Sequence, residues 1–120
     1  MEKVNLADKF DLFQEHWTPK LVGELNDQYV KLAKVQGKFV WHDHREEDEL
    51  FLVLKGTLKL HFRDRPTVTL HPGELYIVPR GVEHCPEADE EVHLMLLEPK
   101  STAHTGDVES DRTVTDLEWI

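Results

Sequence analysis

The sequence predicts an all-β fold in which short antiparallel strands build a barrel or a sandwich. The main observation is a series of six β-rich runs between residues 38 and 97: KFVWH, LFLVL, TLKLHF, TVTL, LYIV and VHLMLL. Turn-forming residues separate the runs, namely Gly56, residues 64–66, 72–73 and 79–81, and Pro86. Many short strands at such close spacing are typical of these two architectures. Several runs are apolar at nearly every position, which predicts strands covered on both faces.

The segment before these runs predicts an N-terminal arm over residues 1–27. Four apolar residues recur at helical spacing and predict a short helix or turn that docks on the barrel: Leu6, Phe10, Phe13 and Trp17. Pro19 ends that pattern. The runs LVGEL and QYVKLAKVQ then flank Asn26-Asp27, a pair that favours the turn of a β-hairpin.

The barrel itself is expected to span about residues 28–99 and to be followed by an irregular tail over residues 100–120. The tail is polar until Leu117, Trp119 and Ile120, so its end is expected to be pinned to the fold. A chain of 120 residues buries roughly two-thirds of its unfolded surface, which is enough for one core. We therefore expect residues 1–120 to form a single domain.

Composition excludes several classes of function. The net charge is −10, with 24 acidic and 14 basic residues, which argues against a nucleic-acid or anionic-membrane partner because both require a basic face. No apolar run approaches the ~18 residues of a membrane span, and the start, MEKVNLADKFDLF, lacks the apolar core of a signal peptide. Cys85 is the only cysteine, so no intrachain disulfide can form. The expected location is the cytoplasm.

Three polar residues lie in the most strand-like part of the chain, VWHDHREEDELF. His42 and His44 are two apart, so on a strand both side chains point to one face. If residues 45–48 form a turn, Glu49 opens the returning strand and lies across from the histidines. The neighbouring acids of that turn are expected to be solvated. Two imidazoles and a carboxylate suit a divalent transition metal, and His84, after the turn at residues 79–81, is a fourth candidate ligand.

Two longer patterns give these residues a context. Gly37-x4-His42-x-His44-x4-Glu49-x6-Gly56 resembles the first motif of the cupin superfamily, and Gly73-x5-Pro79-x-Gly81-x2-His84 resembles its second motif. The resemblance implies a small single-domain cupin, a double-stranded β-helix or jelly-roll barrel. It also implies that His42, His44, Glu49 and His84 ligate one divalent transition metal ion inside the barrel. Mn, Fe, Ni, Cu and Zn all suit such ligands.

The match departs from the family pattern in two places. The gap between His44 and Glu49 has four residues where the family commonly has five, and Ala88 stands where the second motif often ends in Asn. That Asn is not a ligand in the family. The TGD at residues 105–107 and the terminal EWI resemble the tail of small cupins labelled mannose-6-phosphate-isomerase-like, although His104 stands where that pattern has Asn.

The remaining reactive or aromatic residues are expected to have structural roles. Cys85 is expected to be an inert buried thiol. Arg80 is expected to be exposed in a turn, with contact to an anionic substrate as the alternative. Five histidines without paired spacing are expected on the surface or in the tail: His16, His61, His71, His93 and His104. Trp17, Trp41 and Trp119 are expected to pack, with the Trp41 ring facing away from His42.

Two functions remain open at this stage. The first is a small metalloenzyme that isomerises a sugar-like hydroxycarbonyl or oxygenates a small chelating substrate. The second is a non-catalytic module that binds a small molecule and whose metal is structural or sensing, with a metal-free binder as a weaker variant. A homodimer is expected because residues 20–34 suggest extra edge strands and because LFLVL is apolar on both of its faces.

Overall fold

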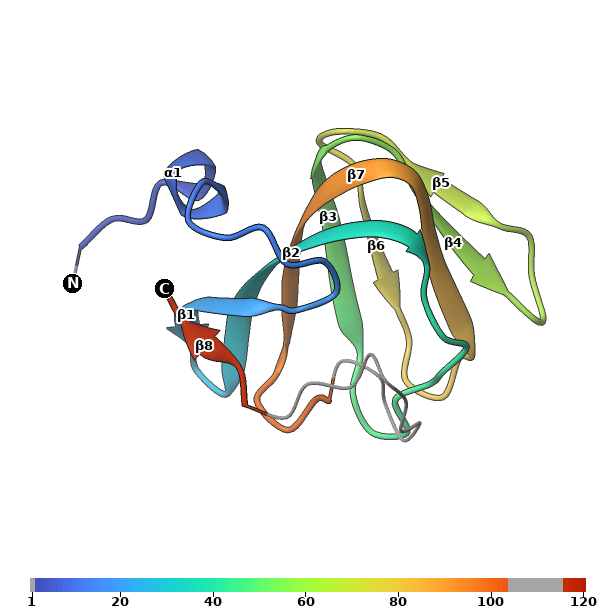
Figure 1. Ribbon diagram of the computed structural model, residues 1–120. Helices are drawn as coiled ribbons and strands as arrows, with labels where there is room; N and C mark the ends of the chain where they lie inside the picture. The colour runs from blue at the N-terminus through green and yellow to red at the C-terminus, as the bar shows by residue number, and fades with distance from the viewer. Residues whose placement is uncertain (1, 104–115) are drawn as a thin grey trace.

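The computed structural model describes residues 2–103 and 116–120, and these residues form an all-β barrel (Figure 1). One helix, α1 (Leu6–Phe10), precedes the strands. The strands are β1 (Lys20–Leu25), β2 (Gln28–Lys38), β3 (Glu49–Lys55), β4 (Leu58–Phe62), β5 (Val68–Leu70), β6 (Leu75–Val78), β7 (His84–Pro99) and β8 (Glu118–Trp119). The all-β prediction is confirmed. No helix among the described residues is long and apolar enough to cross a membrane.

Strand β7 organises the barrel because it pairs with three other strands. Its first residues pair with β4, from Phe62 opposite His84 to Lys59 opposite Glu87. Its later residues pair with β3 on one side and with β2 on the other. The strand order is β5-β4-β7-β2-β1-β8, and β6 joins through β3. Figure 1 shows β7 arching over the barrel from β3 toward β4, so one strand carries the sheet from one wall to the next.

The predicted hairpin and the predicted pinning of the tail are both present. β1 and β2 pair up to Leu25 opposite Gln28, which leaves Asn26-Asp27 as the turn, with Asn26 in the left-handed region at φ 53°. β8 pairs in parallel with the start of β1, and the Ile120 amide donates to the Leu21 carbonyl at 3.0 Å. The expectation of two extra edge strands was wrong for β2. This strand lies between β1 and β7, and from Gln28 to Leu32 its backbone pairs with both of them.

Alternation along the strands builds the core. In β3, β4 and the second half of β7, buried side chains alternate with half-buried ones, so one face of each strand fills the barrel. A second, smaller cluster covers the outside of β2, where Phe10 and Phe13 pack on Leu32. The docking segment is confirmed, but its helix has only five residues. Asn5 caps that helix by accepting a hydrogen bond from the Asp8 amide at 3.0 Å.

The turn between β3 and β4 admits no side chain. Gly56 has φ +85°, a conformation that L residues rarely adopt. A Cβ atom there would lie 2.8 Å from the Glu91 carbonyl oxygen and 3.0 Å from a methyl carbon of Val92. The glycine therefore allows the turn to lie directly against the backbone of β7.

Candidate metal centre

His42 and His84 are brought together by the backbone. His42 lies in the irregular segment between β2 and β3, and His84 begins β7. Their main chains exchange both hydrogen bonds of an antiparallel bridge, at 3.0 and 2.9 Å. The expected pairing of the histidines with Glu49 was wrong, because Glu49 pairs with Val78 of β6. The segment between His44 and Glu49 is therefore a connection between two walls of the barrel and not a hairpin turn.

Two contacts from the turn at residues 79–81 hold the other half of the cluster. The Gly81 amide donates to the His44 carbonyl at 2.7 Å, and the Arg80 amide donates to Asp48 Oδ1 at 2.8 Å. Glu49 opens β3 and points into the barrel with the alternate residues of that strand. Loop and strand together place His44 Nε2 3.4 Å from Glu49 Oε1.

All four residues of the predicted set come together in the structure. His42, His44, Glu49 and His84 are each buried, and one potential ligand atom from each lies within 4.8 Å of the others. His84 Nε2, like His44 Nε2, lies 3.4 Å from Glu49 Oε1. Two rings are already oriented, since His42 Nδ1 donates to the Val40 carbonyl at 3.0 Å and His84 Nδ1 to the Val82 carbonyl at 2.9 Å. A carbonyl can only accept, so Nε2 of both rings carries the lone pair.

The cluster is short of hydrogen-bond partners. His44 Nε2, Glu49 Oε1 and His84 Nε2 are buried and have no hydrogen-bond partner within residues 2–103 and 116–120. Leaving a buried polar atom unpaired costs about 1–3 kcal/mol, so three together need a compensating interaction. Imidazole nitrogens and a carboxylate oxygen are the donors that divalent transition metals accept. The cluster is therefore able to hold a metal ion.

Comparison with known proteins assigns the chain to a family. The family model described as a cupin domain matches residues 28–99. The chain belongs to the cupin family. A solved structure of a cupin-2 domain containing protein from Shewanella frigidimarina NCIMB 400 is 50% identical, has a TM-score of 0.79, and is matched over 81% of this cupin and 94% of that chain.

Two further relatives fit the same assignment. The solved structure of protein NMB1881 from Neisseria meningitidis is 27% identical with a TM-score of 0.76, over 82% of this cupin and 100% of that chain. The Uncharacterized protein YdbB of Bacillus subtilis (strain 168) is 40% identical over 63 residues. That match spans 52% of this cupin and 56%, about half, of the curated relative. Neither comparison bears out the mannose-6-phosphate-isomerase-like resemblance.

The surroundings shift the pKa values of His42 and His44 in opposite directions. Burial lowers the pKa of His42 to about 4, and the neighbouring His84 adds to the effect. Burial also opposes the charged form of His44, but the carboxylate of Glu49, 3.4 Å from His44 Nε2, outweighs that effect and raises the pKa of His44. Burial would raise the pKa of Glu49 as well, yet the polar groups of Glu98, His44 and His84 around it hold it well below its ordinary value.

These shifts predict how acid competes with a metal ion. A histidine ligates only when it is neutral. His44, with its pKa raised above the ordinary 6.5, takes a proton first as the pH falls, whereas His42 stays neutral down to about pH 4. Affinity for Mn²⁺, measured by titration calorimetry from pH 8 to pH 5, should therefore begin to fall near neutral pH. Full affinity retained down to pH 5 would contradict this assignment.

Two charged residues beside the cluster were missed by the sequence analysis. Glu98 of β7 and Lys31 of β2 are 0% and 1% exposed, and Lys31 Nζ donates to Glu98 Oε1 at 2.7 Å. Burial and the carboxylate of Glu49 raise the pKa of Glu98 well above its ordinary value. A signal was present in the sequence. In each of the two strands, the alternate residues on the same face as Lys31 or Glu98 are otherwise apolar. That face points inward, and burying a charge there is costly.

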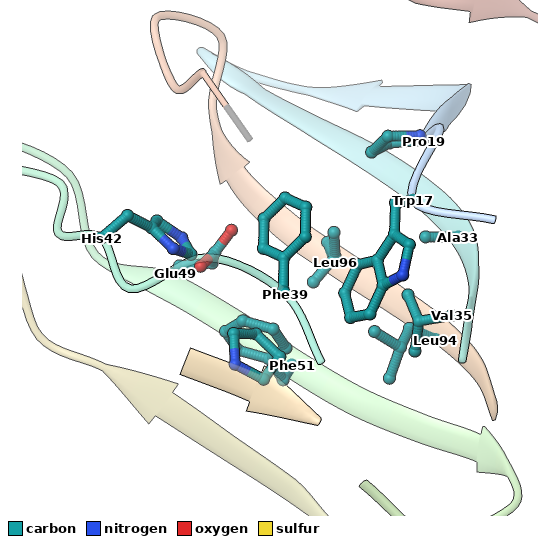
Figure 2. A pocket seen from close by; sticks show the side chains of 11 residues that line it. Trp17, Pro19, Ala33, Val35, Phe39, His42, Glu49, Phe51, Leu94 and Leu96 are labelled. Atoms are coloured by element: carbon teal, nitrogen blue, oxygen red, sulfur yellow. The ribbon is translucent and has the colours of Figure 1, made fainter. Parts of the chain in front are cut away.

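An apolar cavity of about 30 Å³ adjoins the cluster (Figure 2). Its only ionisable lining residues are His42 and Glu49, and the walls are mainly aliphatic and aromatic. Trp17 and Phe39 stack with ring centroids 4.4 Å apart, and Figure 2 shows Phe39 between the indole and His42. A volume of this size holds only one or two waters.

Other predicted residues behave mostly as expected. Cys85 is fully buried and burial raises the pKa of its thiol, while Arg80 is exposed. Trp41 packs under the Arg63 guanidinium, 3.8 Å from the ring centroid. The surface expectation was wrong for His93, which stacks on Phe10 at 4.4 Å. The packing expectation was incomplete for Trp119, which is 52% exposed.

Two of the sequence patterns cannot be compared with this geometry. His104 and the TGD motif at residues 105–107 lie outside the described residues.

Proposed function

We propose that this cupin binds one divalent transition-metal ion through His42, His44, Glu49 and His84, and that the ion presents a small chelating ligand to the barrel interior. The observation that carries the proposal is that His44 Nε2, Glu49 Oε1 and His84 Nε2 are buried without a hydrogen-bond partner among the described residues. They belong to a cluster whose four ligand atoms lie within 4.8 Å. A metal ion would satisfy all of them at once.

Three imidazoles and one carboxylate leave about two positions of an octahedral shell for water or ligand. An ion held in this way polarises a bound carbonyl or hydroxyl group, or activates oxygen when it is redox-active. The protein contributes fixed rings, through Val40 and Val82, and a mainly apolar cavity wall. These features suit a metalloenzyme of the isomerase or dioxygenase type.

The cavity wall favours a chelating substrate over a sugar-like one. Sugars and sugar phosphates need several hydrogen-bond partners or cations, and none of the lining residues is a lysine or arginine. Isomerisation also requires a general base beside the bound ligand. Only His42 and Glu49 among the lining residues ionise, and both are assigned to the metal. The same observation supports the second candidate, a non-catalytic cupin that binds a small ligand around a structural or sensing metal.

Elemental analysis tests the proposal directly. The protein should be purified without a metal-affinity column and should contain about one divalent ion per chain. The Co²⁺-loaded protein should then change its visible spectrum on addition of acetohydroxamate, a small bidentate chelator, because open positions accept it. Mannose 6-phosphate should leave the spectrum unchanged. Protein that binds none of Mn²⁺, Fe²⁺, Co²⁺, Ni²⁺, Cu²⁺ or Zn²⁺ would refute the proposed function.

We also propose that the protein is a homodimer. Five apolar residues on the outer face of three neighbouring strands support this: Leu50 and Leu52 of β3, Leu75 and Ile77 of β6, and Leu97 of β7. The strand register places Leu50 beside both Ile77 and Leu97. Leu75 and Ile77 are 53% and 51% exposed. A contiguous apolar surface of this kind is typical of an interface, and a second copy of the chain would cover it.

Light scattering should therefore give a mass of about 28 kDa, twice the 14.0 kDa of one chain. Ile77→Lys should convert the protein to a monomer, because the substitution places a charge in the middle of the apolar surface. Thr69→Lys, on the exposed face of β5, is the matched control and should stay dimeric. A wild-type mass of about 14 kDa at micromolar concentration would contradict the dimer.

A further inference from the structure

The arm that precedes β1 reaches the cavity beside the metal cluster through one aromatic side chain. Trp17 has φ 57°, a left-handed conformation that bulky residues rarely adopt. Its amide donates to the Lys34 carbonyl at 2.9 Å, and its indole Nε1 donates to the Gln36 carbonyl at 2.9 Å. The residue is therefore fixed to β2 through both its backbone and its ring, in a conformation that costs free energy.

The indole and the proposed metal ligands lie on opposite sides of the cavity. Trp17 stacks on Phe39 with the ring planes at 11°, and Phe39 meets the His42 ring at 89° with centroids 5.5 Å apart. His42 and Glu49 line the cavity on one side (Figure 2). Trp17 and Ala33 line it on the other side. A ligand bound to the ion from inside this cavity would carry its far end toward the indole.

Packing alone explains the position of this indole poorly. Core side chains normally interdigitate and leave few voids, since protein interiors are packed as densely as organic crystals. Trp17 instead borders a cavity of about 30 Å³, and Ala33 beside it is the smallest of the lining side chains. Strained backbone is found preferentially at functional sites. The strained tryptophan and the small alanine together give the cavity a defined end.

We propose that Trp17 is a specificity-determining residue, which forms the end wall of the ligand cavity and limits the apolar group that a metal-bound chelator can carry. The inference rests on the proposed function and names its ligand class. A volume that holds one or two waters fits an apolar group of one or two carbon atoms. The expected ligand is a small bidentate chelator with a methyl or ethyl substituent. A phenyl substituent would collide with the indole.

Hydroxamates of increasing size test this role on the Co²⁺-loaded protein. Acetohydroxamate, propionohydroxamate and benzohydroxamate share one chelating group and differ in the attached methyl, ethyl or phenyl. In the wild type, the dissociation constant read from the visible spectrum should rise about tenfold or more from acetohydroxamate to benzohydroxamate, because overpacking is costly. Trp17→Ala should abolish or reverse this difference, and its affinity for Co²⁺ should stay that of the wild type. Trp17→Phe keeps a ring on Phe39, so it preserves more of the packing, and should narrow the difference.

A change on the other lining residue should act in the opposite direction. Ala33→Val fills part of the cavity with a residue that suits a strand, so it should weaken propionohydroxamate more than acetohydroxamate. Trp119→Phe is the control, because Trp119 lies on β8 and is 52% exposed. Its ranking of the three hydroxamates should be that of the wild type.

The outcomes separate this inference from the proposed function. An unchanged ranking in both Trp17→Phe and Trp17→Ala would overturn the role of Trp17 while leaving the metal site intact. Wild-type protein that binds Co²⁺ and all three hydroxamates equally well would overturn it too, because no wall would then limit the substituent. Wild-type protein without affinity for Co²⁺ would overturn the proposed site itself, and with it this inference.

Discussion

His44→Ala is expected to abolish most metal binding while the barrel stays folded. The substitution removes one of the four proposed ligands, but the strands and core of the barrel lie elsewhere. It also removes a buried ring whose two nitrogens have no partner in the structure. Elemental analysis should find much less than one ion per chain, and circular dichroism should be unchanged.

Thermal melting gives a second measurement of the same effect. Metal present at about 100 times its dissociation constant stabilises a fold by roughly 2.7 kcal/mol. For a domain of this size that raises the melting temperature by on the order of 10 °C. Chelation should lower the melting temperature of the wild type by this amount and should leave that of His44→Ala unchanged.

The control for these measurements is His71→Ala. His71 is exposed on the turn before β6 and should retain full metal content. His93 serves less well, since its stacking on Phe10 couples it to stability. Stoichiometric metal in a His42→Ala/His44→Ala double variant would show that the ion binds elsewhere.

Gly56→Ala should produce the largest loss of stability among the glycine substitutions at positive φ. A left-handed conformation costs a residue with a Cβ about 1–2 kcal/mol. The contact of 2.8 Å with the Glu91 carbonyl oxygen is with backbone that is fixed in β7, so neither group can move away easily. Overpacking of this kind adds about 1–3 kcal/mol, and a total of roughly 2–5 kcal/mol is expected.

Gly73→Ala is the matched control, because Gly73 has the same φ of +85° and no heavy atom within 4 Å of the added Cβ. It should lose only the conformational cost of about 1–2 kcal/mol. Urea unfolding of both variants measures the difference, provided that their m-values agree. Equal losses in the two variants would show that the turn relaxes away from β7.

The motif spacing predicted the barrel and all four members of the cluster, because those positions are fixed by the family pattern. It did not predict how they meet. Two residues of different strands pair according to the path of the whole chain, and His84 reaches His42 only because β7 crosses from β3 to β4. Local reasoning instead placed Glu49 opposite the histidines, since the acidic residues between them resemble a turn.

Glu98 and Lys31 show a different limit of the sequence. Neither belongs to a motif, and a single charge in a strand is usually exposed on its outer face. The run VHLMLLEP is hydrophobic at most positions of both parities, so the signal that Glu98 faces inward is weak. Once the register is known, Glu98 lies on the same face as Leu94 and Leu96, and its burial becomes visible.

The path of β7 also determines the order in which the molecule can assemble. The hairpins β1–β2 and β4–β5 are local and can form early, whereas β7 joins strands that lie far from it along the chain. Contacts between distant segments slow folding, to milliseconds or longer in barrels of this kind. His84 reaches His42 only when β7 closes the barrel. A metal ion would therefore bind after folding, to a finished site, and would not serve as a template for the fold.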